Sequence, residues 1–227
     1  MMPRNIPEIF ELLAARFGPL QWWPAESPYE VVTGAILTQN TAWTNVEKAI
    51  VNLKAAGALV PATMRDLSLA ELEQLIRPAG FFRQKAARLH HVTTVLVDDY
   101  GGRVEDLCAG PLDAARARLL ALPGVGPETA DSILLYAAHR PSFVVDAYTR
   151  RIFTRLGLLD GTERYEAIRT LFMSELPQEA PLFNEYHALV VTLAKSHCRK
   201  RRPECPTCPL VAICPFVESP AENRLTL

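Results

Sequence analysis

The stretch LPGVGPETA, at residues 122–130, lies within residues 112–138, which we interpret as a helix, a tight turn and a second helix. Gly124 and Gly126 bracket Val125, which we expect to anchor the turn in the core. Because glycine has no Cβ, a phosphate can approach the backbone N–H groups here and at the start of the next helix. An ordinary helix–helix turn with a glycine cap is the alternative, but the longer string is more specific than a Gly-x-Gly pair.

The rest of the chain also has a helical pattern. Alanine, leucine, arginine and glutamate are frequent, and apolar residues recur three and four positions apart, as in Ile6, Ile9 and Leu13. We find no convincing run of alternating β-branched residues, and proline and glycine separate the helical segments. The sequence therefore predicts an all-α fold, and 227 residues correspond to one large domain or two small ones.

Composition and charge narrow the class of protein. Apolar residues make up 49% of the chain, and none of their runs approaches the roughly 20 residues of a membrane-spanning helix. The first twenty residues carry charges such as Arg4 and Glu8, so we expect no signal peptide and a cytoplasmic protein without membrane contact. The net charge of −1 argues against general nucleic-acid binding. Basic residues nevertheless cluster locally, around Asp146 and near Cys198.

Four cysteines near the C-terminus form the pattern C-x6-C-x2-C-x5-C: Cys198, Cys205, Cys208 and Cys214. In a reducing cytoplasm such clusters bind metal, and four thiolates suit either zinc or an iron–sulfur cluster. Zinc sites usually pair two C-x2-C motifs, and this segment has one. The pattern therefore favours a [4Fe–4S] cluster, with zinc and disulfides as alternatives.

Asp146 follows the apolar, strand-like run 143–145 and precedes a helical segment. The simplest interpretation is a helix N-cap, which contributes about 1 kcal/mol. A carboxylate at a helix start can also activate water or stabilise an oxocarbenium-like sugar cation. The two roles are compatible.

Together the hairpin string, the Val145-Asp146 pair and the four-cysteine segment resemble the endonuclease III family of helix-hairpin-helix DNA glycosylases. The resemblance runs from about residue 25 to Cys214. It implies two helical lobes, with DNA in the cleft between them and the damaged nucleotide flipped out. The implied boundaries are an N-terminal helix within 1–25, a six-helix barrel at 26–139, and a C-terminal lobe at 140–227 with the cluster loop at 198–214.

The same resemblance implies roles for individual residues in base excision repair. The protein would act as a monomer on damaged double-stranded DNA, with Asp146 as the catalytic carboxylate. Gln39 would fill the space left by the flipped base, and the cluster would order the basic loop 199–204. The implied DNA-binding residues are Gln39, Leu122, Gly124, Val125, Gly126, Thr129, Arg199 and Lys200.

One position departs from the bifunctional members of this family. They carry a lysine just after the hairpin, where this chain has Glu128. A carboxylate cannot form the Schiff base by which such enzymes cleave the strand. We therefore expect a monofunctional glycosylase with weak or absent lyase activity, although another amine could serve. Glu128 is either a base-pocket acid or base, or a structural residue in a helix first turn.

Four further strings look like the 3-methyladenine DNA glycosylase III branch: 21–24, 35–41, 76–86 and 128–131. Trp22 and Trp23 would then stack on a cationic alkylated purine through cation–π attraction. Alternatively they pin the N-terminal helix. That branch lacks the four cysteines, so the substrate stays open between alkylated purines and oxidised pyrimidines. A bifunctional endonuclease III-type lyase, a non-catalytic DNA-binding iron–sulfur protein and a zinc scaffold are further alternatives.

Overall fold

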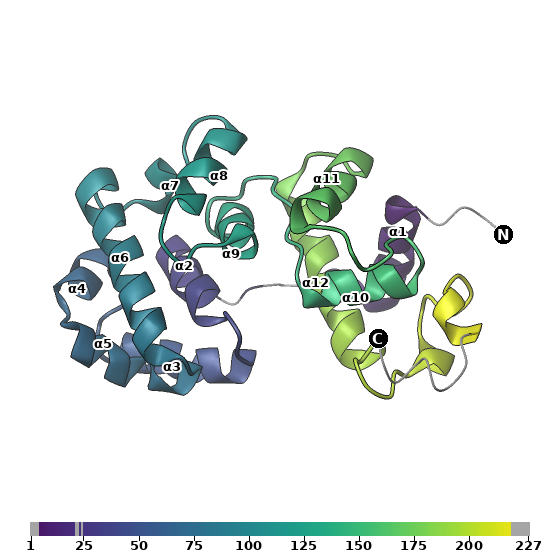
Figure 1. Cartoon of the computed structure of the whole chain (residues 1–227), viewed down its shortest axis with the longest axis horizontal. Helices are drawn as coiled ribbons and strands as arrows, with labels where there is room; N and C mark the ends of the chain where they lie inside the picture. The colour runs from purple at the N-terminus through teal and green to yellow at the C-terminus, as the bar shows by residue number, and fades with distance from the viewer. Residues whose placement is uncertain (1–4, 21–22, 24, 219–227) are drawn as a thin grey trace. The chain divides into compact units, whose positions relative to one another are not determined.

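The computed structural model describes residues 5–20, 23 and 25–218, and all regular structure in these residues is helical (Figure 1). This confirms the predicted all-α fold. None of the helices in this part of the chain has the length and apolar character needed to cross a membrane. The chain forms two compact units, one of Met1–Trp22 with Phe143–Leu227 and one of Trp23–Ser142.

The unit Trp23–Ser142 is built around α2 (Pro28–Leu37), in which every residue from Tyr29 to Leu37 is buried. Ser27 caps this helix by accepting the Glu30 N–H. A helix that is buried on all sides forms the centre of a bundle, and α2 contacts α3, α6, α9 and η2. The other elements are α3 (Trp43–Ala55), α4 (Pro61–Asp66), α5 (Leu69–Leu75), η1 (Arg77–Ala79), α6 (Phe82–Tyr100), α7 (Val104–Leu107), α8 (Leu112–Leu120), α9 (Pro127–Ser132) and η2 (Ile133–Ala137).

The other unit combines the N-terminal helix with the C-terminal third of the chain. In Figure 1 the purple α1 lies beside the green α12, and both α1 and α10 contact α12. Its elements are α1 (Ile6–Phe17), α10 (Ala147–Arg155), α11 (Tyr165–Glu175), α12 (Ala180–Ser196), η3 (Cys205–Thr207) and η4 (Pro215–Glu218).

Aromatic packing fixes the segment that leads to Asp146. The Phe143 ring stacks on Phe172 with centroids 4.1 Å apart and meets Phe183 edge-on at 5.5 Å. Residues 143–145 are buried and form no strand. Because Phe143 is fully buried, it holds in place the backbone of Asp146, the residue at which α10 begins.

Candidate functional site

The predicted helix–turn–helix at 112–138 consists of α8, a tight turn, and α9 continuing into η2. Leu122 and Val125 are buried, and the Val125 N–H donates to the Leu122 carbonyl at 3.0 Å. Gly124 has a φ of +82°, which other residues rarely adopt. The N–H groups of Gly124 and Gly126 donate to no other group in the described residues. The turn thus exposes backbone donors rather than side chains.

Gln39 lies in the turn after α2 and is bound to this hairpin. Its Nε2 donates to the Gly124 carbonyl and to Thr129 Oγ1, both at 3.0 Å. Its Oε1 accepts from Arg88 Nη1 at 2.6 Å. The Thr129 side chain is buried, so its hydroxyl serves Gln39 rather than the surface. Two residues predicted separately, Gln39 and Thr129, therefore belong to one hydrogen-bonded group.

Two basic residues of α6 that sequence analysis did not single out complete this region. The Arg88 side chain covers Gly124, since a Cβ there would lie 2.4 Å from Arg88 Cδ. Lys85 is buried, and its Nζ donates to the Leu37 and Ala79 carbonyls, both at 2.8 Å. Burial, with a smaller effect of the nearby Arg88 charge, lowers the pKa of Lys85 to about 8. Lys85 thus joins the end of α2 to η1.

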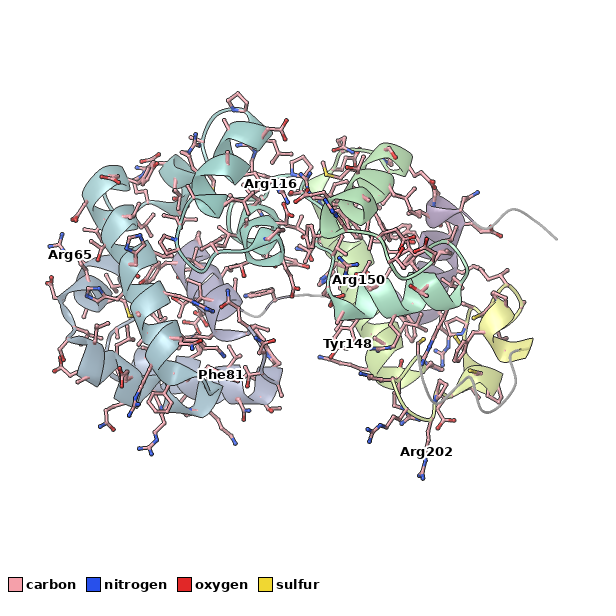
Figure 2. All side chains as sticks on the ribbon, viewed as in Figure 1. Arg65, Phe81, Arg116, Tyr148, Arg150 and Arg202 are labelled. Carbon is pink, nitrogen blue, oxygen red and sulfur yellow. The ribbon has the colours of Figure 1, made fainter. Side chains whose placement is uncertain are left out.

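Phe81, directly before α6, is an exposed aromatic residue. Its side chain stands away from the ribbon in Figure 2, and 64% of the residue is accessible. Its φ of +46° is uncommon for a residue other than glycine. Sequence pattern does not distinguish an exposed phenylalanine from a core one, which is why this residue was missed. Its exposure makes Phe81 a candidate residue for contact with a binding partner.

Asp146 caps α10, as the sequence predicted. Its Oδ1 accepts the Thr149 N–H at 2.7 Å and the Thr149 hydroxyl at 2.9 Å. Its Oδ2 lies 3.5 Å from Nε2 of His187, a buried residue of α12. Burial alone would raise the pKa of Asp146, but the interactions with His187 and Thr149 outweigh it and hold the pKa below its usual value. The carboxylate is therefore ionised at neutral pH.

Trp23 lies in an aromatic group of the unit Trp23–Ser142. Its ring stacks on Tyr136 with centroids 4.8 Å apart and meets Trp43 edge-on at 5.4 Å. Gly34 gives it room, since a Cβ there would lie 3.3 Å from the Trp23 ring. Tyr136 and Trp43 were not selected from the sequence. Trp22 lies outside the described residues.

The remaining polar residues of the predicted site are exposed. Glu128 lies in the first turn of α9 and is exposed, and its carbonyl accepts the Ser132 hydroxyl at 2.7 Å. Arg199 and Lys200 are exposed, and Arg199 pairs with Glu204. The charge of Arg199 is thus partly compensated, a feature that the sequence did not indicate.

The thiols of the four clustered cysteines affect the pKa values of Cys208 and Cys214. Burial mainly, with a contribution from the other three thiols, raises the pKa of Cys208 to about 11, while the Leu210 N–H acts in the opposite direction. No three histidine, cysteine, aspartate or glutamate side chains in the described ranges are grouped in a way that could hold a metal ion. None of the five cysteines forms a disulfide within the described residues.

Arg155 of α10 contacts the start of this cysteine segment. Its guanidinium is 3.3 Å from Cys198 Sγ and donates to the Arg199 and Lys200 carbonyls at 2.9 and 3.2 Å. It also covers the Phe216 ring at 4.3 Å. This buried cation therefore fixes the backbone that carries the two exposed basic residues.

Comparison with known proteins identifies the family. Residues 33–178 match the HhH-GPD superfamily base excision DNA repair protein, and the chain belongs to this family. A Methanocaldococcus jannaschii protein, named provisionally as a DNA repair glycosylase, is 47% identical over 211 residues, covering 92% of this chain and 95% of that protein.

Two solved structures show the same fold. A non-covalent endonuclease III–DNA complex has a TM-score of 0.81 and 26% identity over 94% of this chain and 95% of that chain. The Helicobacter pylori 3-methyladenine DNA glycosylase bound to 1,N6-ethenoadenine has a TM-score of 0.74 and 27% identity, covering 85% of this chain and 98% of that chain. The resemblance to endonuclease III-like glycosylases that the sequence indicated is thereby confirmed.

Proposed function

We propose that this protein is a monofunctional DNA glycosylase that hydrolyses the bond between a damaged base and its sugar in double-stranded DNA, acting as a monomer. Membership in a base excision repair family supports an enzyme that acts on DNA. The observation that carries the proposal is the ionised Asp146 carboxylate at the start of α10.

Asp146 supplies the chemistry in this proposal. As the base departs, positive charge develops on the sugar, and a nearby carboxylate stabilises it. Water then adds to C1′ and gives one proton to the carboxylate, while the departing base leaves with the bonding electron pair and gains a proton from solvent. A carboxylate whose pKa is below its usual value is charged while the base departs, and it becomes neutral only when it takes the proton of the attacking water.

The hairpin offers no amine for the competing lyase reaction. Glu128 stands where bifunctional relatives have a lysine, and a carboxylate cannot form a Schiff base. Lys85 is buried and bound to two carbonyls, and Lys54 pairs with Glu26 and Glu30. These contacts occupy the amines of two lysines, and the glutamate in place of the hairpin lysine supports hydrolysis rather than a lyase reaction.

DNA contacts are assigned by their chemistry. The exposed N–H groups of Gly124 and Gly126 suit a phosphate, as do the exposed Arg199 and Lys200 side chains. In this proposal Gln39 fills the space left by the flipped base, and the exposed Phe81 stacks on a base. Leu122, Val125 and Thr129 act indirectly, because their buried side chains hold the hairpin in shape.

The aromatic group favours an alkylated purine as the substrate. Alkylation at a ring nitrogen places positive charge on the base, and aromatic faces attract such a cation by roughly 0.5–2 kcal/mol. Trp23, Trp43 and Tyr136, together with Trp22, would supply these faces. The similarity to 3-methyladenine DNA glycosylase supports this choice. The higher TM-score against endonuclease III favours an oxidised pyrimidine as the second candidate.

The four cysteines fit a [4Fe–4S] cluster by their chemistry. The set is all thiol, none of these cysteines forms a disulfide within the described residues, and the Leu210 and Phe216 N–H groups are directed at Cys208 and Cys214. When bound, the cluster would crosslink the cysteine segment and order the loop 199–204. Chemical analysis that finds four iron and four sulfide per chain supports this assignment, and stoichiometric zinc contradicts it.

Base release from defined duplexes tests the proposed function. Duplexes carrying 3-methyladenine, 1,N6-ethenoadenine, thymine glycol or a thymine·guanine mispair are incubated with the wild type and with Asp146→Asn. We expect release of an alkylated purine by the wild type and no release by the variant, with both proteins still binding the duplex. Absence of release from every duplex would contradict the proposal. Release of thymine glycol alone would identify an oxidised pyrimidine, rather than an alkylated purine, as the substrate.

A further inference from the structure

The contact between Asp146 and His187 joins residues that are far apart in the chain. Asp146 is fixed from one side by Thr149 and from the other by His187, whose Nε2 is 3.5 Å from Oδ2. The side chains are 14% and 7% exposed respectively. The separation is longer than a full hydrogen bond, and such contacts often tighten when substrate binds.

The other charged groups on the packed elements have different partners. On α10, Arg150 donates to the Glu163 carbonyl, Arg151 to the Cys198 carbonyl and Arg155 to the Arg199 carbonyl. On α12, Glu185 accepts the Leu20 N–H, while Lys195 is exposed at the far end of the helix.

The helices α11 and α1 carry further charged residues. On α11, Glu175 accepts the Ile6 N–H, and Glu166 and Arg169 are the other charged groups. On α1 the charged residues are Glu8, Glu11 and Arg16. The Tyr165 hydroxyl accepts the Val145 N–H next to Asp146. Burial raises the pKa of Asp146, and the interactions with His187 and Thr149 lower it.

We propose that His187 is a positioning residue for the Asp146 carboxylate, fixing Oδ2 while Thr149 fixes Oδ1. The inference rests on the proposed glycosylase function of Asp146. Without His187, Thr149 would still hold Oδ1 of Asp146, but Oδ2 would be free to rotate. The buried carboxylate would also have one partner fewer. A buried carboxylate that loses a donor takes up a proton more readily. His187 therefore keeps the carboxylate both oriented and charged.

Two substitutions separate this role from simple packing. His187→Leu keeps the apolar bulk but removes the donor, and His187→Gln keeps a donor of similar length. Single-turnover base release is measured from pH 3.5 to pH 8, because the Asp146 pKa lies below its usual value and the acid limb falls in the lower part of this range. For His187→Leu we expect the acid limb of the rate profile to move to higher pH by about one pH unit, which is about a tenfold loss on that limb. For His187→Gln we expect most of this shift to be reversed.

Tyr186→Phe is the matched control on the same helix. Tyr186 is also buried, and its hydroxyl donates to the Ile6 carbonyl at 2.7 Å rather than to Asp146. Removing this hydroxyl disturbs α12 packing without touching the carboxylate. We expect its rate profile to stay parallel to that of the wild type. A His187→Leu profile that is also parallel, with the rate lowered equally at every pH, would overturn the positioning role.

A measurement without substrate distinguishes failure of this inference from failure of the proposed function. The carbon-13 signal of the Asp146 carboxyl is titrated in wild type and in the two His187 variants. A higher titration midpoint in His187→Leu supports the inference even if no duplex is processed. Identical midpoints overturn it even if the wild type releases bases.

Discussion

At the scale of single residues, Asp146 combines a structural and a proposed chemical role that substitution can separate. Asparagine caps a helix about as well as aspartate but carries no charge, whereas alanine does neither. We expect Asp146→Asn to unfold at nearly the wild-type urea concentration with base release lost. We expect Asp146→Ala to lose about 1 kcal/mol of unfolding free energy in addition. Substantial base release by Asp146→Asn would contradict the assignment of this carboxylate.

The two hairpin glycines provide a second test. Gly124 has a φ of +82° and lies against Arg88, so a Cβ is strained in two ways. We expect Gly124→Ala to lower the unfolding free energy by about 1–3 kcal/mol. Gly126 has a φ of −89° and no heavy atom within 4 Å of a Cβ position. We expect Gly126→Ala to leave stability nearly unchanged but to weaken DNA binding, since the methyl group would obstruct a phosphate.

Thermal or urea unfolding, with duplex binding measured on the same samples, gives both quantities. Equal stability losses for the two variants would contradict the different backbone requirements of these glycines. Unaltered DNA affinity in Gly126→Ala would contradict a phosphate contact at this turn.

At the scale of elements, the hairpin is held together by a buried ion pair between α8 and α9. The Nε and Nη2 groups of Arg116 (labelled in Figure 2) donate hydrogen bonds to the two carboxylate oxygens of Asp131, at 2.8 and 3.0 Å. Asp131 is fully buried and also accepts the Ser142 hydroxyl. The network therefore links the hairpin to Ser142, the last residue of the unit Trp23–Ser142.

Removing one partner of a buried pair leaves an uncompensated charge, which costs about 3–5 kcal/mol. We expect Arg116→Met to lower the unfolding free energy by about 3 kcal/mol in urea titrations. Arg103→Met is the control, because Arg103 and Asp106 form an exposed pair with side chains 68% and 50% accessible. Exposed pairs contribute less than about 1 kcal/mol, so comparable losses in both variants would contradict the role of burial.

Local patterns predicted the elements better than the contacts between them. Asp146 was predicted as a cap because a cap depends on residues three positions apart. The partners Arg88 and His187 were missed because they act on Gln39 and Asp146 across the fold, where no sequence spacing relates them. The buried Lys85 was missed for a similar reason, since its carbonyl partners carry no side-chain signature.

At the scale of the whole molecule, the proposed roles fall in both compact units. Gln39, the hairpin and Trp23 belong to Trp23–Ser142, while Asp146, His187 and the four cysteines belong to the other unit. The family resemblance of the sequence named these residues except His187, whereas the exposed Phe81 and the group of Trp43, Trp23 and Tyr136 became visible only with the fold.

The central claim is release of a base by hydrolysis without an amine, and strand cleavage tests it most directly. A duplex from which the wild type releases the base is divided after reaction, and one half is treated with alkali. We expect strand breaks only in the alkali-treated half, and no protein–DNA adduct when borohydride is present during reaction. Breaks without alkali, accompanied by a borohydride-trapped adduct, would show a Schiff base and contradict the inference from Glu128.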